Sequence, residues 1–272
     1  MKTNLSQQKW TLEIVPAHAD QIHVFENLVS EIFVTMIPGT SIHASQAALS
    51  QVMDAGFTPV PHIAARNFKS ESELESYLNT VKELGIKKAL ILAGGNATPA
   101  GPFSDSLDLL RMNTFLNSGI DTIAFAGHPE GNPEDPNPWS SLEQKYAFAR
   151  ENMLQMEVVT QWSFSAKKMN AYIHDLKTRT IDCPISIGIA GPASLKTLLK
   201  FAKVCGVNAA STVIKKQGFK MGRLLVANNP DSFLSQIDAP TNLHIYPFGG
   251  LKKCAEWLKK HQNEAKLNLT SV

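Results

Sequence analysis

Short apolar runs alternate along the chain with longer segments in which apolar residues return every three or four positions. The short runs are rich in β-branched and aromatic residues, a pattern typical of buried strands. Strands that alternate with helices in this way pack as a parallel sheet covered by helices. Eight strands are predicted, over residues 10–15, 31–37, 58–64, 87–93, 121–127, 157–162, 184–190 and 242–248.

The segments between the strands have helical periodicity. In residues 71–85 and 194–206 the apolar residues form one face of a helix. Both segments end at a glycine, Gly85 or Gly206, which is the usual residue after a helix C-terminus, and Ser194 suits the N-cap of the second helix. Eight β-plus-α units in 272 residues predict an α/β fold, a (β/α)8 TIM barrel. A doubly wound open sheet is the alternative.

No change of composition divides the chain, so we expect residues 1–272 to form one barrel domain. A long proline-rich segment, residues 128–139, follows the fifth predicted strand. Loops in that position carry the site of a barrel, so this segment is expected to be functional.

Composition narrows the class of partner. The chain has 26 basic and 24 acidic residues in both halves, which argues against a nucleic-acid surface or a polybasic membrane patch, and no stretch is apolar enough to span a membrane. Cys183, Cys205 and Cys254 are odd in number and far apart, so neither a disulfide framework nor a structural zinc is expected. We expect a cytoplasmic protein that binds a small molecule and no metal.

Polar and glycine residues gather at the predicted C-terminal ends of the strands, where a barrel forms its site. They are Glu13, Thr35, His62, Arg66, Gly94, Gly95, His128, Glu130, Gln161, Gly191 and Tyr246.

Glu13 is the most unusual of these residues, because it stands between Leu12 and Ile14 in an otherwise apolar strand. Side chains alternate between the two faces of a strand, so Glu13 is predicted to face the barrel lumen. Burial there is expected to raise its pKa and to let it donate a proton near neutral pH. The alternative is a structural ion pair with a neighbouring lysine or arginine.

The other positions have weaker signals. For His62 a core histidine and a site residue both fit the pattern, and for His128 solvent exposure or turn capping is the alternative. Residues 91–101 run from a strand into a glycine-rich loop, which suits an anion but matches no phosphate-binding motif. Gln161 offers a donor and an acceptor beside Trp162, an arrangement suited to a flat heterocycle.

Taken in order, these segments resemble the methylenetetrahydrofolate reductase family. The matching stretches are TLEIVP, VTM, PHIAAR, HPEGNPE, VVTQWSF and LHIYPF. The resemblance implies an oxidoreductase of one-carbon metabolism and methionine biosynthesis, which interconverts 5,10-methylenetetrahydrofolate and 5-methyltetrahydrofolate with NADH or NADPH. In the family FAD usually relays the hydride, and the enzymes are commonly oligomers, which implies a homo-oligomer here.

The resemblance also implies roles for single residues. Glu13 falls on the general acid, which protonates the bridging nitrogen of the folate so that the ring opens to an iminium. Gln161 falls on the residue that hydrogen-bonds the pterin. The positions assigned to cofactor binding are Thr35, His62, Gly94, Gly95, His128, Asn132 and Arg150.

The chain departs from the family where the flavin is held. Ala93 and Gly95 stand where the family usually has an arginine and an aspartate, and His128 and Asn132 replace a tyrosine and a histidine. One lost arginine contact to a diphosphate costs about 1.5–3 kcal/mol. Some distant members pass hydride directly from NADH, so the sequence leaves FAD binding open. The alternatives are a barrel that binds folate or a nucleotide without turnover, and a barrel enzyme for another substrate.

Overall fold

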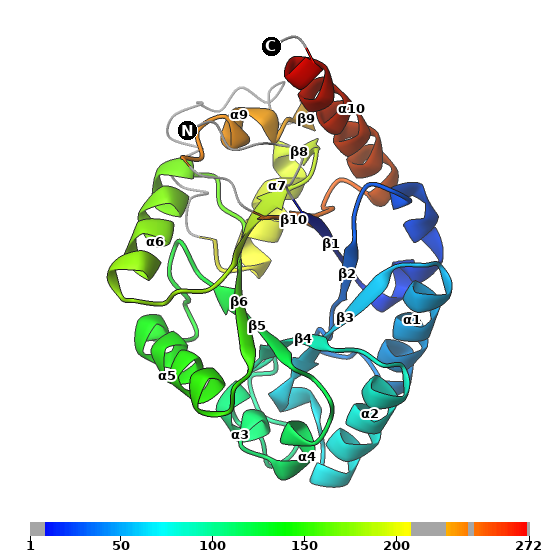
Figure 1. The fold of residues 1–272 in the computed structure, drawn as a ribbon, viewed down its shortest axis with the longest axis vertical. Helices are drawn as coiled ribbons and strands as arrows, with labels where there is room; N and C mark the ends of the chain where they lie inside the picture. The colour runs from blue at the N-terminus through cyan, green and yellow to red at the C-terminus, as the bar shows by residue number, and fades with distance from the viewer. Residues whose placement is uncertain (1–8, 208–226, 239–241, 271–272) are drawn as a thin grey trace.

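The computed structural model describes residues 9–207, 227–238 and 242–270. Eight parallel strands close into a barrel in the order β1-β10-β7-β6-β5-β4-β3-β2 (Figure 1). The strands are β1 (Trp10–Ile14), β2 (Glu31–Val34), β3 (Thr58–Ala64), β4 (Lys88–Leu92), β5 (Thr122–Gly127), β6 (Gln155–Thr160), β7 (Ile185–Ala190) and β10 (Asn242–Tyr246). The eight predicted strands and the TIM barrel are therefore confirmed.

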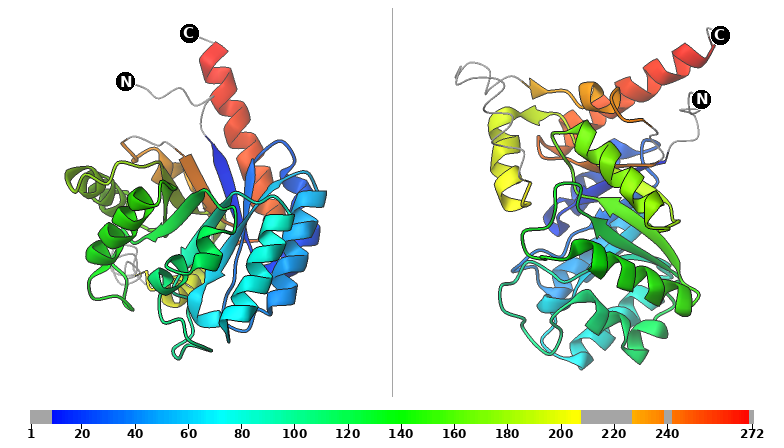
Figure 2. Two further views of the ribbon diagram at one scale, coloured as in Figure 1. Left: turned by 60° about the horizontal axis from the view of Figure 1, so that its bottom comes forward. Right: turned by 90° about the vertical axis from the view of Figure 1, so that its left-hand side faces the viewer.

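Helices follow the strands and surround the barrel (Figure 2). The first is a 3-10 helix, η2 (Pro16–Phe25), and a short 3-10 turn, η3 (Ala65–Asn67), follows β3. The α-helices are α1 (Ile42–Asp54), α2 (Glu71–Glu83), α3 (Ser106–Leu110), α4 (Asn113–Leu116), α5 (Pro138–Glu151), α6 (Ala166–Thr178), α7 (Leu195–Val204), α9 (Asp231–Leu234) and α10 (Leu251–Thr270). Two short strands, β8 (Ala193–Ser194) and β9 (Ala227–Asn228), pair antiparallel outside the barrel.

The helix ends follow the predicted signals. The Ser194 side chain caps α7 by accepting a hydrogen bond from the backbone N–H of Thr197 at 3.1 Å. Gly85 and Gly206 have φ of +67° and +66°, a left-handed conformation that favours glycine after a helix. The sequence pattern therefore located both ends of α7 correctly.

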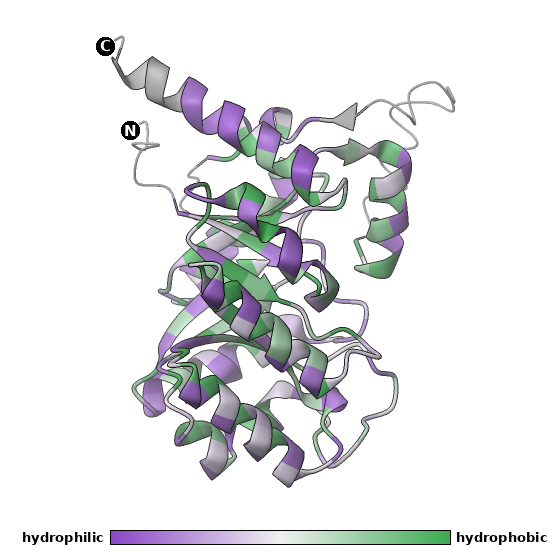
Figure 3. Cartoon of the chain, turned by 90° about the vertical axis from the view of Figure 1, so that its right-hand side faces the viewer, coloured by the Kyte–Doolittle hydropathy of each residue, from purple (hydrophilic) through white to green (hydrophobic). Residues whose placement is uncertain are grey.

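Apolar side chains fill two layers. Alternate strand residues such as Leu12 and Ile14 point outward into the core between strands and helices. Inside the barrel a smaller cluster fills the lumen, formed by Phe33, Val60, Leu90, Ala124 and Val159. Figure 3 shows hydrophobic residues concentrated on the strands and hydrophilic residues along α10.

A network of charges lies at the N-terminal end of the lumen. The ammonium group of Lys88, the first residue of β4, lies 2.8 Å from Glu31 Oε2 and also contacts Glu157. The hydroxyl of Ser186 donates to the Glu157 carboxylate. The same side chains line a cavity of about 500 Å³ at this end of the barrel, and their polar groups are paired with one another.

Candidate functional site

Glu13 faces the barrel lumen, as predicted. It is in register with Phe33 of β2, and parallel neighbours in register point to the same face. Its carboxylate lies 3.5 Å from His62 Nε2 on β3 and 3.6 Å from His244 Nε2 on β10. The ion pair with a lysine or arginine that was considered for Glu13 is not among its contacts in the described part of the chain. Three strands thus bring one carboxylate and two imidazoles together.

His244 is held from its other side. Its Nδ1 lies 2.8 Å from the Thr11 hydroxyl, which also lies 3.4 Å from the carbonyl oxygen of Leu243. The ring is fully buried and packs edge-on against Phe33, with 4.7 Å between ring centroids. These contacts fix the plane of the imidazole and keep its Nε2 directed toward Glu13.

The expected direction of the Glu13 pKa is wrong. Burial does act to raise this pKa, but the neighbouring His244 and His62 outweigh burial, and the pKa of Glu13 lies below its ordinary value. Burial is also the main cause that lowers the pKa of His62 to about 4, against the attraction of Glu13. The sequence pattern identified the lumen carboxylate and His62 but not His244, which also favours the ionised form of Glu13.

Several polar atoms beside this cluster are buried without a hydrogen-bond partner among the described residues. They are Thr35 Oγ1, His62 Nε2 and His244 Nε2. Buried polar atoms in folded proteins almost always have partners, so unsatisfied ones at one place indicate a position for a polar ligand or for water. The C-terminal half of the lumen has the character of a binding site.

A cavity of about 620 Å³ opens at the C-terminal ends of β4, β5 and β6. Such a volume suits a small molecule. Six of the predicted site residues line it, namely Arg66, Gly94, Gly95, His128, Asn132 and Gln161. Its charged lining consists of Arg66, Lys145, Lys203, Asp105, Glu134 and Asp135.

The glycine-rich loop after β4 packs closely against neighbouring residues of the barrel. Gly94 has φ of +96°, and a Cβ added there would lie 3.2 Å from the Cβ of Ala64. A Cβ at Gly95 would lie 3.3 Å from Pro38, so a side chain would need local rearrangement. Arg66 holds the loop from the other side by donating to the Ser104 carbonyl at 2.8 Å.

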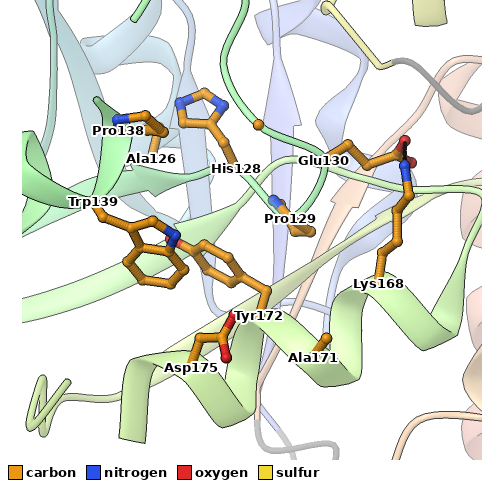
Figure 4. A pocket seen from close by; sticks show the side chains of 11 residues that line it. Ala126, His128, Pro129, Glu130, Pro138, Trp139, Lys168, Ala171, Tyr172 and Asp175 are labelled. Carbon is orange, nitrogen blue, oxygen red and sulfur yellow. Dashed lines mark hydrogen bonds and ion pairs between the residues drawn. The ribbon is translucent and has the colours of Figure 1, made fainter. Parts of the chain in front are cut away.

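His128 separates this cavity from a second one of about 280 Å³ between the loop after β5 and helices α5 and α6. Figure 4 shows Trp139 lying against Tyr172 in this second cavity, and their ring centroids are 4.8 Å apart. Burial, with the charge of Lys145, lowers the pKa of His128 to about 4. His128 is therefore a half-buried residue in the wall of both cavities, and it is neutral at neutral pH.

The loop after β5 is fastened by Glu130. Its carboxylate accepts from the Ser163 hydroxyl at 2.6 Å and from Lys168 at 2.9 Å, and its side chain is only 3% exposed. These bonds tie the loop to the start of α6, as Figure 4 shows for Lys168. The proline-rich segment is thus anchored at its start, beside both cavities.

Gln161 follows β6 directly and lines the larger cavity. Its Oε1 accepts from the backbone N–H of Trp162 at 3.0 Å, which leaves the NH₂ group to donate. The sequence pattern gave Gln161 both a donor and an acceptor for a ligand, and the structure uses the acceptor internally.

Arg150 lies away from the other predicted residues. It is exposed in the last turn of α5, packs over the Tyr146 ring at 6.0 Å, and is absent from the described lining of the larger cavity. A helix that follows a barrel strand runs antiparallel to it, so its last turn lies at the N-terminal end of the barrel. Its assignment to the cofactor-binding set is therefore not supported by its position.

Three residues of the site were not predicted, namely Thr11, Lys145 and His244. His244 could have been found, because it lies two residues before Tyr246 on the same strand. Residues two apart on a strand point to the same face, here the lumen. Lys145 lines the larger cavity, where burial lowers its pKa although Asp105 and Asp135 favour its charged form. Its spacing along α5 carries no signal of burial, because the cavity wall comes from distant loops.

Two kinds of feature are absent from the described residues. No helix among residues 9–207, 227–238 and 242–270 has the length and apolar character needed to cross a membrane. Over the same ranges no group of three or more His, Cys, Asp and Glu side chains has the arrangement of a metal site.

Solved structures with a similar fold include dihydropteroate synthases. The enzyme from Thermus thermophilus is 11% identical, with a TM-score of 0.50, and the match covers 95% of this chain and 94% of that chain. The enzyme from Yersinia pestis, solved with a pterine–sulfa conjugate, is 8% identical, with a TM-score of 0.50 and coverage of 98% and 95%. At this identity the likeness concerns the fold alone.

The profile of one protein family, methylenetetrahydrofolate reductase, matches residues 17–219. The match begins after β1 and ends before β10, so Glu13 and His244 lie outside it. It includes the glycine-rich loop, the proline-rich loop and Gln161. Because the match spans well over half of the chain, the protein belongs to the methylenetetrahydrofolate reductase family.

Proposed function

We propose that this protein is a reductase that interconverts 5,10-methylenetetrahydrofolate and 5-methyltetrahydrofolate, with NADH or NADPH as the hydride partner. The observation that carries the proposal is Glu13, a lumen carboxylate beside His62 and His244, in a member of this family. Such a reaction belongs to one-carbon metabolism, on the route that supplies methyl groups for methionine in the cytoplasm. Other oligomers in the family suggest a homo-oligomer.

The chemistry needs one proton and one hydride. In the reducing direction the Glu13 carboxyl gives a proton to the nitrogen that leaves the methylene bridge, and the bridge carbon becomes an iminium on the other nitrogen. Hydride from the nicotinamide then reduces this carbon to a methyl group. The unsatisfied atoms Thr35 Oγ1 and His62 Nε2 offer hydrogen-bonding positions beside Glu13, and the Gln161 NH₂ group donates to the pterin.

The described residues do not fit a tightly held FAD. The charged side chains lining the larger cavity are three cations and three carboxylates, so they offer a diphosphate no net positive charge. Arg66 already donates to the carbonyls of Ser104 and Asn96, and Lys145 faces Asp105 and Asp135. The mechanism above therefore contains no flavin step.

A nicotinamide co-substrate makes smaller demands on the cavity. It must bind and leave in every turnover, so a balanced set of charges suffices where a resident flavin needs strong contacts. Gly94 and Gly95 of the glycine-rich loop line the cavity, and His128 supplies a neutral wall. Direct hydride transfer from NADH or NADPH to the folate is the form of the reaction that we propose.

The test is NADH or NADPH oxidation with methylenetetrahydrofolate, with and without added FAD, for the wild type and the Glu13→Gln variant. We expect turnover without FAD, and a loss of about 10²-fold or more in kcat for Glu13→Gln because the acid is removed. His23→Gln is the matched control, since His23 is an exposed residue of η2. Unchanged turnover in Glu13→Gln would contradict the role of Glu13.

Gly95 favours one second candidate, a folate-binding protein without turnover. The family's aspartate is missing at this position, which lines the larger cavity. That candidate predicts folate binding by calorimetry but no nicotinamide oxidation in either direction. Starting the assay from 5-methyltetrahydrofolate with NAD⁺ separates it from an enzyme that works mainly in the oxidising direction.

A further inference from the structure

The loops that follow β5 and β6 are joined at two points. At the ends of these strands the backbone N–H of Gln161 donates to the Gly127 carbonyl at 2.7 Å, which extends the parallel pairing of β5 with β6. In a parallel ladder the next bond would run from the N–H of residue 129 to the carbonyl oxygen of Gln161. Pro129 has no N–H, so the ladder ends there, and the second link between the loops is made by side chains.

Glu130 makes this second link. Its Oε1 accepts from the Ser163 hydroxyl at 2.6 Å, and its Oε2 lies 2.9 Å from the ammonium group of Lys168 (Figure 4). The Ser163 hydroxyl lies 3.4 Å from the Ser165 carbonyl, a much longer contact, and accepts from the Ser165 backbone N–H at 2.9 Å. The Glu130 side chain is 3% exposed and that of Lys168 is 48% exposed. Because ion pairs with exposed lysines contribute little, the bond to Ser163 is the stronger link.

Gln161 lies between the two links. One residue, Trp162, separates it from Ser163, and the buried Trp162 ring packs edge-on against Phe164 and Phe248. The Gln161 Oε1 accepts from the Trp162 backbone N–H at 3.0 Å, so the direction of the amide depends on the direction of that N–H. The direction of the N–H in turn depends on where the chain is held at Ser163.

We propose that Glu130 is a positioning residue, which through Ser163 fixes the backbone that orients the Gln161 amide and thereby sets the affinity for folate. The inference rests on the proposed function, in which the Gln161 NH₂ group donates to the pterin. Glu130 lines the smaller cavity and is absent from the described lining of the larger one, so it acts on a ligand of the larger cavity through another residue. Residues that contact a ligand depend on such supporting hydrogen bonds for their geometry.

The first test is the KM for methylenetetrahydrofolate, together with kcat, in variants of the link. Ser163→Ala and Glu130→Ala are each expected to raise KM about 10-fold, because the loosened amide binds less well. The value of kcat should change by less than about 3-fold, because the amide contributes to substrate and transition state alike. Glu130→Gln keeps an oxygen that accepts from Ser163, so its KM should stay close to that of the wild type. A 10-fold higher KM in Glu130→Gln would mean that the charge, not the link, matters, and would overturn the proposal.

Ser186→Ala is the matched control. Ser186 is buried and also donates its hydroxyl to a buried carboxylate, that of Glu157, at the opposite end of the barrel. The variant therefore removes the same group and the same kind of bond without touching either loop, and its KM for folate should equal that of the wild type. If Ser163→Ala and Ser186→Ala have the same KM, Ser163 has only a structural role and the proposal is wrong, whatever the two variants do to the Tm.

A double-mutant cycle tests whether the link acts through Gln161. Gln161→Ala removes the amide that the link is proposed to orient. In that background Ser163→Ala should raise the KM for folate no further. If the two substitutions instead multiply their effects on KM, the link acts on folate by another route and Gln161 is not its target.

Calorimetric titration with 5-methyltetrahydrofolate separates this proposal from the proposed reaction. If the wild type binds this folate without turnover and Ser163→Ala weakens binding about 10-fold, the reaction fails and the positioning role stands. If turnover occurs and Ser163→Ala keeps the wild-type KM, the positioning role fails and the reaction stands. A wild-type protein that does not bind folate overturns both.

Discussion

Lys88 is the central cation of the charge network at the N-terminal end of the barrel. Its ammonium group meets Glu31 and Glu157, and the three side chains are 13%, 23% and 9% exposed. Burial acts to lower the pKa of Lys88, but the two carboxylates outweigh burial, and the pKa lies above its ordinary value. Lys88 is therefore cationic at neutral pH and compensates two partly buried anions.

Replacing Lys88 by methionine keeps the aliphatic stem and removes the charge. Two carboxylates are then left side by side in the lumen without a cation, and breaking a buried ion pair from one side costs about 3–5 kcal/mol of unfolding free energy. For a chain of this size that corresponds to a fall in Tm of roughly 6–20 °C. The stabilisation by Lys88 is present below its unfolded pKa and is lost only as the pH rises through the raised folded pKa.

Thermal and urea unfolding of Lys88→Met at neutral pH measure this effect. Lys260→Met is the control, because Lys260 pairs with Glu264 at 3.7 Å on α10 with side chains 76% and 59% exposed. An exposed pair of this kind contributes only about 0.3–0.5 kcal/mol. Adding Glu31→Gln and Glu157→Gln to Lys88→Met should recover part of the lost stability. If Lys88→Met unfolds like Lys260→Met, the assigned role of the charge network is wrong.

Two further predictions concern single sites. The pKa of His62 is about 4 in the folded protein, so the unfolded chain binds more protons than the folded one between about pH 6.5 and pH 4. The free energy of unfolding therefore falls as the pH falls through this range. His62→Gln should remove about 2 kcal/mol of this fall between pH 6.5 and 4.5, measured by urea unfolding. Gly127→Ala should destabilise the barrel by about 1–3 kcal/mol, because the added Cβ would lie 2.8 Å from Val158 Cγ1 and 2.9 Å from the Tyr172 hydroxyl. Thermal melting of Gly127→Ala, with and without Tyr172→Phe, measures this effect. An unchanged Tm in Gly127→Ala would contradict it.

The barrel could be predicted from the sequence because its signals are local. Each strand is a short apolar run, and a helix end such as that of α7 is marked by Ser194 and Gly206. The lumen position of Glu13 also follows from local alternation with Leu12 and Ile14. These features depend on neighbours in the chain, so they are visible without the tertiary structure.

The site was predicted less well because its partners come from distant segments. Thr11 and His244 are 233 residues apart and meet only because β10 closes the barrel against β1. The direction of the Glu13 pKa depends on that closure, since burial alone acts in the opposite direction. The assignment of Arg150 to cofactor binding has a related weakness. Arg150 lies in the last turn of α5, and this turn is at the N-terminal end of the barrel, away from the larger cavity.

Buried polar groups are paired at one end of the lumen and unpaired at the other, and this contrast indicates where a ligand binds. At the N-terminal end Lys88 is paired with both neighbouring carboxylates, and Ser186 bonds one of them. At the C-terminal end Thr35 Oγ1 and the Nε2 atoms of His62 and His244 lack hydrogen-bond partners among the described residues. Unsatisfied buried atoms destabilise a fold, whereas the polar groups that line the cavity at the N-terminal end already satisfy one another. The unpaired end therefore fits a substrate that completes its hydrogen bonds around Glu13.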